Sequence, residues 1–168
     1  MTTRDATGAL AVLRAAQRDD LDAILAIEAV SYRHPWTRAM FEREFEQAWS
    51  SILVASETHA DGSQRGHARV VGFIIFWRVQ DEFHLLNVAV AEDARRRGIG
   101  TLLLNELDTR ARSADAAVIT LEVRAASKGA QELYRQLGYR QVGLRKNYYA
   151  DEGEDAVVML CELRNRGF

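Results

Sequence analysis

Leu85-Leu86-Asn87-Val88-Ala89-Val90 forms a continuous, mostly apolar run, and the basic turn Arg95-Arg96-Arg97-Gly98-Ile99-Gly100 follows it. The next residues, Thr101-Leu102-Leu103-Leu104-Asn105-Glu106-Leu107, form an amphipathic stretch. Together the three segments predict a strand, a tight turn and a helix. This stretch decides the fold, because a strand that leads through a glycine turn into a helix begins a β-α-β unit.

The basic turn is suited to binding an anion. The first turn of a helix has backbone N–H groups without intrahelical partners and carries the positive end of the helix dipole. Gly98 and Gly100 allow close approach of the backbone and positive φ, and three arginines, Arg95 to Arg97, add forked donors. The other interpretation is a solvated basic turn before an ordinary helix, since short glycine patterns are weakly specific.

The turn matches neither of two well-known phosphate loops. A P-loop ends in Gly-Lys followed by Ser or Thr, whereas Thr101 directly follows Gly100. The dinucleotide pattern G-x-G-x-x-G needs a third glycine where this chain has Leu103. We therefore expect an anion other than a nucleoside triphosphate or NAD.

The composition is that of an ordinary globular protein, with 48% hydrophobic and 27% charged residues and a net charge of −2. This balance does not indicate a nucleic-acid partner. The single cysteine, Cys161, excludes an internal disulfide and fits a reducing compartment. No signal segment or membrane-spanning apolar run is apparent, so we expect a cytoplasmic protein without membrane contact.

Hydrophobic periodicity predicts the other elements. Expected strands cover 10–13, 52–55, 70–77, 83–90, 117–123, 139–144 and 155–163, and expected helices cover 18–32, 37–49, 101–113 and 127–137. Residues 57–67 are expected to form a polar hairpin loop. Thr37 and Ser127 are expected N-caps, and Gly138 is expected to end the last helix.

The order β-α-α-β-β-β-α-β-α-β-β predicts an α/β fold with a mixed sheet. Antiparallel hairpins should lie beside a right-handed β-α-β crossover around 85–123, whose two strands should be parallel. No repeat or linker is apparent, so residues 1–168 are expected to form a single domain in which 1–9 are a loose leader.

The motifs resemble those of the GNAT acetyltransferases. Asn87-Val88-Ala89-Val90 with Arg95-x-x-Gly98-x-Gly100 is similar to motif A, and Leu121-Glu122-Val123-Arg124 with Leu133-Tyr134-x-x-Leu137-Gly138-Tyr139 resembles the second motif. Pro35-Trp36 and Arg145-Lys146-Asn147-Tyr148-Tyr149 resemble the RimI branch, which acetylates the N-terminal alanine of small-subunit ribosomal protein eighteen. The resemblance spans residues 10 to 163 and implies the GNAT fold, a mixed, mostly antiparallel sheet with a central β-α-β crossover flanked by helices.

The resemblance also implies acetyl-CoA as cosubstrate, with its pyrophosphate on the turn and its pantetheine arm along the strand edge. The implied cofactor-binding residues are Val88, Ala89, Val90, Arg95, Arg96, Arg97, Gly98, Ile99, Gly100, Thr101 and Lys128. The side chains of Leu86, Val88 and Val90 are expected to be buried, so only their backbone would act. Lys128 stands where the family usually has asparagine, and it either reaches a phosphate or lies in solvent.

Glu122 is the candidate general base. An α-amino group has a pKa of about 7.7–8.0 and is partly neutral near pH 7, so a carboxylate can remove its remaining proton directly or through one water. The period of two puts Glu122 on the more polar face of its strand, with Thr120 and Arg124. The other interpretation is a surface or salt-bridged glutamate, for which Arg124 is a candidate partner.

Tyr134 is the candidate general acid for the departing thiolate, because a phenol with an ordinary pKa of about 10 is protonated at neutral pH. It also lies on the apolar stripe of its helix, so a core tyrosine is the other interpretation.

Two aromatic and cationic loops are candidates for acceptor binding, and the resemblance implies that they pinch a peptide N-terminus. Their candidate residues are Tyr32, Pro35, Trp36, Tyr148 and Tyr149. Trp36 could instead be a hydrophobic staple at a helix start.

Other chemistries are not indicated. The four histidines, His34, His59, His67 and His84, lack metal-ligand spacing, so no metal is expected. No serine lies in a nucleophile elbow, which favours direct amine attack in a ternary complex. Two other functions stay open: a GNAT enzyme acting on a small amine or a lysine side chain, and a non-catalytic acyl-CoA-binding regulatory module.

Overall fold

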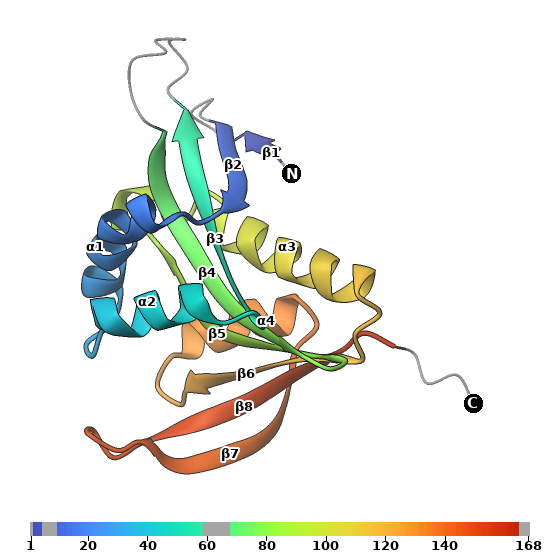
Figure 1. Cartoon of the computed structure of the whole chain (residues 1–168). Helices are drawn as coiled ribbons and strands as arrows, with labels where there is room; N and C mark the ends of the chain where they lie inside the picture. Colours follow the sequence, from blue (N-terminus) through green and yellow to red (C-terminus); the bar gives the residue numbers. More distant parts are fainter. Residues whose placement is uncertain (1, 5–9, 59–67, 165–168) are drawn as a thin grey trace. The chain divides into compact units, whose positions relative to one another are not determined.

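The computed structural model describes residues 2–4, 10–58 and 68–164 (Figure 1). These residues divide into two compact units. Unit 1 comprises Met1–Phe76 and Asn87–Leu107, and unit 2 comprises Trp77–Leu86 and Asp108–Phe168. Two strands, β4 (Arg69–Val79) and β5 (Glu82–Val90), contribute residues to both units. The expected single domain stays a prediction.

The strands of unit 1 follow the order β1-β2-β3-β4-β5. β1 (Thr2–Arg4) pairs antiparallel with β2 (Leu10–Ala15), which pairs antiparallel with β3 (Ser50–Thr58). Residues 2–4 therefore form a strand inside the expected loose leader, because the extended backbone finds a partner in β2. The rest of that leader, 1 and 5–9, and residues 59–67 of the expected hairpin loop lie outside the described residues.

The helices of unit 1 begin close to where the sequence predicts. The expected first helix is a 3₁₀ turn, η1 (Arg18–Asp20), followed by α1 (Leu21–Ser31). Thr37 caps α2 (Arg38–Glu46), since its Oγ1 accepts a hydrogen bond from the Met40 N–H at 3.3 Å. A short 3₁₀ turn, η2 (Glu92–Ala94), precedes the glycine turn, and α3 runs over Ile99–Ser113. α2 ends three residues before the expected Trp49, which is exposed.

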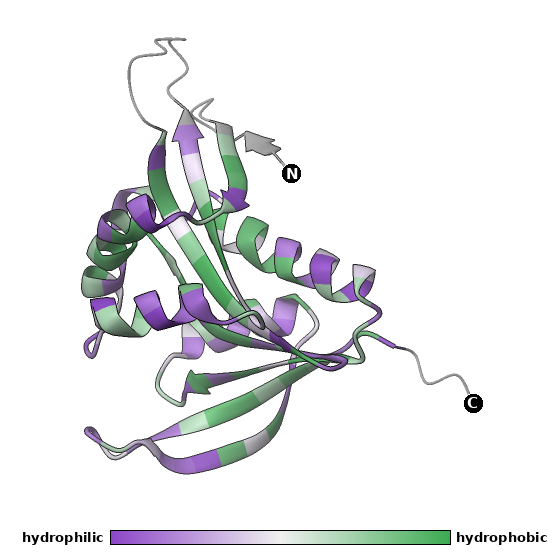
Figure 2. Cartoon of the chain, viewed as in Figure 1, coloured by the Kyte–Doolittle hydropathy of each residue, from purple (hydrophilic) through white to green (hydrophobic). Residues whose placement is uncertain are grey.

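The core of unit 1 lies on both sides of β4, which Figure 2 shows as a mostly hydrophobic strand. Successive residues of a strand face opposite sides, so Gly72 faces α3 and Phe73 faces α2. A Cβ at Gly72 would lie 3.2 Å from Ile99 Cγ2, while the Phe73 ring meets the Phe41 ring edge-on at 5.7 Å. Gly72 thus permits α3 to pack close against β4.

The strands of unit 2 follow the order β5-β6-β8-β7. β6 (Val118–Arg124) pairs parallel with β5 and antiparallel with β8 (Glu154–Glu162), whose other neighbour is the antiparallel β7 (Arg140–Tyr149). The parallel pair confirms the expected β-α-β crossover. Together with the antiparallel pairs, it confirms a mixed α/β fold with a mostly antiparallel sheet.

The last helix of unit 2, α4 (Lys128–Gln136), ends as the sequence predicts but begins differently. Gly138 has φ +94° and donates to the Arg135 carbonyl, while Tyr139 donates to the Tyr134 carbonyl at 3.0 Å, which is a Schellman ending. Ser127 occupies the N-cap position without a side-chain capping hydrogen bond, so the expected hydroxyl cap is wrong.

Candidate functional site

The glycine turn, Arg95–Gly100, is open at its centre. Gly98 has φ +80°, and a Cβ built on it would meet nothing within 4 Å. α3 starts at the next residue, and its first backbone bond runs from Leu102 N–H to the Gly98 carbonyl at 2.9 Å. The prediction of positive φ is confirmed for Gly98 but is wrong for Gly100, which lies inside α3 with helical backbone. The second residue of the turn with positive φ is Arg96, at +62°.

The three arginines of the turn differ in their surroundings. Arg95 donates from Nε to the Val90 carbonyl at 3.1 Å and from Nη2 to the Ser31 hydroxyl at 3.2 Å. Arg97 forms a close ion pair with Glu57, and Arg96 is exposed. Arg95 and Arg97 therefore tie the turn to α1 and β3, and Arg96, between them, is exposed.

The end of β5 presents backbone groups away from β4. Ala91 N–H donates to the Val71 carbonyl at 2.8 Å, so the backbone of residue 91 faces β4 and that of the alternate residues 88 and 90 faces the opposite side. There the Val88 carbonyl accepts from the Tyr32 hydroxyl at 2.6 Å. The expected burial of the side chains is wrong: Leu86, Val88 and Val90 are half-buried, because the fully buried face of β5 belongs to the alternate residues.

A buried carboxylate ties the loop between α1 and α2 to β5. Glu28 is 1% exposed; its Oε1 accepts from the Trp36 N–H and its Oε2 from Asn87 Nδ2, both at 2.9 Å. Burial raises the pKa of Glu28, although the two hydrogen bonds oppose the shift. The Trp36 ring lies 5.4 Å from that of Phe41, which matches a hydrophobic staple at the start of α2. Pro35, in the same loop, is exposed.

Three side chains of unit 2 form what we term the Glu122 centre: Glu122 on β6, His84 on β5 and Arg145 on β7. His84 Nε2 lies 2.6 Å from Glu122 Oε2, and Arg145 Nη2 lies 3.5 Å from Oε1. The Glu122 side chain is 11% exposed. Burial of the alternate residues Leu121 and Val123 confirms its predicted face.

Neither partner of Glu122 was predicted from the sequence. The alternative pairing with Arg124 is wrong, because Arg124 Nη1 lies 2.9 Å from Glu154 and 3.1 Å from Glu152. His84 was predicted only not to be a metal ligand. The signal that finds it is the strand register, in which His84 pairs with Thr120, two residues before Glu122 on the same face.

Tyr134 is buried on α4, with its ring 5.7 Å from that of Tyr139. Burial raises the pKa of Tyr134 to about 12, with a smaller contribution from Tyr149. Its phenol therefore stays protonated throughout the physiological range. This environment is compatible with a proton donor and with a core tyrosine.

The hairpin between β7 and β8 carries Tyr148 and Tyr149, whose rings meet edge-on at 5.1 Å. The Arg124 guanidinium lies 3.9 Å from the Tyr149 ring centroid, and that of Arg145 lies 5.5 Å from the Tyr148 centroid. Tyr148 is 48% exposed. The hairpin thus presents an aromatic side chain to solvent on a cationic support. Lys128, at the start of α4, is exposed.

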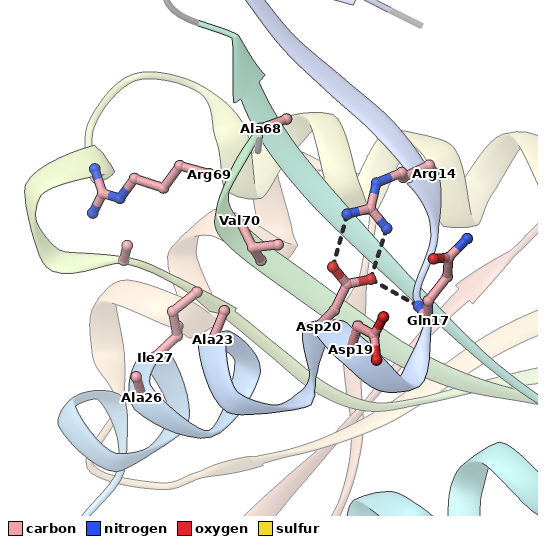
Figure 3. A pocket seen from close by; sticks show the side chains of 11 residues that line it. Arg14, Gln17, Asp19, Asp20, Ala23, Ala26, Ile27, Ala68, Arg69 and Val70 are labelled. Atoms are coloured by element: carbon pink, nitrogen blue, oxygen red, sulfur yellow. Dashed lines mark hydrogen bonds and ion pairs between the residues drawn. The ribbon is translucent and has the colours of Figure 1, made fainter. Parts of the chain in front are cut away.

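Unit 1 also contains a cavity of about 820 Å³ between η1, α1 and β4 (Figure 3). Two of its charged side chains are paired with each other: Arg14 binds Asp20 through two hydrogen bonds of 2.6 and 2.8 Å, and Asp20 also accepts from Gln17 N–H. No predicted site residue lines it. In the described part of the chain, no helix is long and apolar enough to cross a membrane, and no three His, Cys, Asp or Glu side chains gather as a metal site.

Comparison with known proteins connects these features to one family. Residues 21–139 match the model of the acetyltransferase (GNAT) family. The [ribosomal protein bS18]-alanine N-acetyltransferase of Salmonella typhimurium is 34% identical over 83% of this chain and 89% of the relative, and that of Escherichia coli K12 is 32% identical over the same shares.

Solved structures give the same result. The crystal structure of the ribosomal-protein-S18-alanine N-acetyltransferase from Escherichia coli superposes with a TM-score of 0.80 at 29% identity, over 94% of this chain and 96% of that one. Arabidopsis thaliana NAA60, in complex with acetyl-CoA, shares the fold with a TM-score of 0.79 at 17% identity, over 92% and 99%. With the family model matching 21–139 and relatives aligning along most of their length, this chain belongs to the GNAT family and is an acetyl-CoA-dependent N-acetyltransferase.

Proposed function

We propose that this protein acetylates the α-amino group of a protein N-terminus, and that its acceptor is the N-terminal alanine of a small-subunit ribosomal protein. The activity named for the relatives supports this acceptor. The observation that carries the proposal is the Glu122 centre, because a largely buried carboxylate with a fixed partner can take the proton that an attacking amine must lose. A ribosomal acceptor fits a reaction in the cytoplasm, and the enzyme is proposed to act without direct contact to nucleic acid or membrane.

The glycine turn and the end of β5 are the proposed binding surface for acetyl-CoA, which would supply the activated acetyl thioester. The open space at Gly98 and the start of α3 fit a phosphate group. Ile99 and Thr101 belong to that first helical turn, and exposed Arg96 adds charge beside it. The backbone of Val88 and Val90 offers hydrogen-bonding groups to an extended arm, with Ala89 between them.

The proposed chemistry is a direct transfer. The amine nitrogen forms a bond to the acetyl carbonyl carbon, and the carbon–sulfur bond breaks. Glu122 accepts the amine proton, directly or through one water. Tyr134 donates its phenolic proton to the thiolate sulfur and regains one from solvent; its raised pKa, about 12, means that the phenol carries that proton at neutral pH.

The acceptor peptide is proposed to contact the two aromatic loops. Tyr32 and Pro35 are exposed in the first loop and Tyr148 in the second, while Trp36 and Tyr149 are half-buried supports. The staple packing of Trp36 suggests that its backbone and ring fix the shape of the loop. Lys128 is proposed as a weak, solvent-exposed phosphate contact.

A thiol-release assay with a panel of acceptors tests the function. A peptide that begins with alanine should release CoA much faster than a polyamine, free lysine or no acceptor. Fast release with the small amines and none with the peptide would show an enzyme for small amines. Binding of acetyl-CoA with no release for any acceptor would show a regulatory module.

A further inference from the structure

Glu122 has two polar partners of very different quality. The contact from His84 Nε2 is 2.6 Å long and joins side chains that are 33% and 11% exposed. The contact from Arg145 is 3.5 Å long, and the Arg145 side chain is 56% exposed. A long contact from an exposed arginine contributes little, whereas a short, charge-assisted hydrogen bond is roughly twice as strong as a neutral one. His84 is therefore the partner that decides where the carboxylate lies.

The backbone fixes this partnership. β5 and β6 are parallel neighbours, with His84 opposite Thr120 and Leu85 opposite Leu121. Side chains two residues apart on a strand share a face, so His84 and Glu122 project from the same face of two hydrogen-bonded strands. The short contact thus follows from the register and not from a flexible surface encounter.

The imidazole is itself held in place. The indole of Trp77, at the end of β4, meets the His84 ring edge-on, with centroids 6.2 Å apart and planes at 82°. This packing restricts rotation of the ring about its side-chain bonds. A fixed ring presents Nε2 to Glu122 in a constant direction.

The proton must lie on His84 Nε2 when Glu122 acts as a base. An ionised carboxylate has only acceptors, so a 2.6 Å contact with it requires an N–H on the imidazole. One N–H bond to Oε2 leaves the other lone pairs of the carboxylate available for an amine or a water. It also removes rotational freedom from a side chain that otherwise has three mobile torsions.

We propose that His84 is a positioning residue for N-terminal acetylation: its Nε2–H, held by Trp77, fixes the Glu122 carboxylate in the orientation that accepts the amine proton. This proposal rests on the role of Glu122 in the proposed function. Catalytic bases are commonly oriented by a third group in this way, and small misplacements of reacting groups slow reactions severely.

Two amide substitutions of different length test the proposal. His84→Gln carries an N–H at nearly the position of Nε2, whereas His84→Asn is one bond shorter and does not reach Oε2. We expect His84→Asn to lower kcat by about tenfold or more, and His84→Gln to stay within about threefold of the unsubstituted enzyme. The KM for acetyl-CoA should not change in either. Arg140→Gln, which alters an exposed ion pair on β7, is the control and should retain kcat.

A double-mutant cycle completes the test. If His84 acts through Glu122, then His84→Asn should slow a Glu122→Gln enzyme by no more than about twofold. Equal losses in the Gln and Asn variants, an unchanged kcat in His84→Asn, or a full loss in the Glu122→Gln background would overturn the proposal. If the Glu122→Gln enzyme works at the unsubstituted rate, Glu122 is not the base, and the positioning role of His84 is overturned with it. If no peptide acceptor is acetylated, the proposed function itself has failed. Thermal unfolding of each variant checks that the fold is retained.

Discussion

The glycine turn and the Glu122 centre differ in which groups they present: backbone groups in the turn and side chains in the centre. In the turn, Gly98 and the start of α3 present backbone groups, while the Arg95 and Arg97 side chains are engaged by Ser31 and Glu57. In the centre, the reactive groups are side chains from β5, β6 and β7. The first surface depends on local backbone shape, and the second depends on strand register. The two should therefore fail separately: damage to the turn should weaken acetyl-CoA binding, and damage to the centre should slow the transfer.

The largest expected effect is at Glu122. Glu122→Gln keeps the side-chain shape but cannot accept a proton, so kcat should fall by about 10²–10⁴-fold while the Kd for acetyl-CoA changes little. The loss should shrink as pH rises through about 8, because the α-amino group then deprotonates without help. Steady-state rates across that range, together with calorimetric binding of acetyl-CoA, measure both parts. If Glu122→Gln also lost affinity for acetyl-CoA, the Glu122 centre and the glycine turn would not act independently.

Tyr134→Phe should give the next largest effect. The substitution removes one hydroxyl and almost no volume, so loss of a proton donor predicts a kcat lower by about 10²-fold with retained stability. Tyr139→Phe is the matched control, because that ring is also buried and lies 5.7 Å from Tyr134. Equal, near-normal kcat values in the two variants would assign Tyr134 to the core. The thiolate would then take its proton from water.

Gly98→Val tests the other side of the comparison. Saturating acetyl-CoA, at 100 times its Kd, should stabilise the unsubstituted protein by about 2.7 kcal/mol. A β-branched residue is strained at φ +80°, and its side chain would occupy the open space at the turn, so the variant should lose most of this gain. Gly143→Val, at a glycine of β7 without positive φ, should retain it. Thermal unfolding of each protein with and without acetyl-CoA measures this gain. A full gain in Gly98→Val would show that the turn does not bind acetyl-CoA.

The smallest expected effect concerns the loop that Glu28 anchors. Burial raises the pKa of Glu28 above its ordinary 4.5, which means that the folded protein favours the protonated side chain. The stability gained from this proton is complete below pH 4.5 and is lost as the pH rises through the raised pKa. Glu28→Gln is permanently neutral and should be more stable than the unsubstituted protein at neutral pH. Denaturant unfolding across the acid range should show the difference narrowing towards pH 4. A difference independent of pH would mean that the charge on Glu28 carries no cost.

The same contrast explains what the sequence predicts. The turn, the parallel β5–β6 pair and the polar face of β6 follow from glycine spacing and periodicity within short segments. His84 is separated from Glu122 by 38 residues, and its role depends on a pairing register that periodicity does not reveal. The direction of Arg95 depends on Ser31, which lies on α1. Local backbone shape is therefore predictable here, and side-chain partners from distant elements are not.

The most direct test of the central claim uses one peptide with two possible acceptors. The peptide begins with alanine and contains an internal lysine, and fragmentation mass spectrometry locates the acetyl group after incubation with acetyl-CoA. We expect acetylation of the α-amino group, with the lysine unmodified and with the rate strongly reduced for Glu122→Gln. Acetylation of the lysine, with the α-amino group left free, would contradict N-terminal acetyl transfer by this protein.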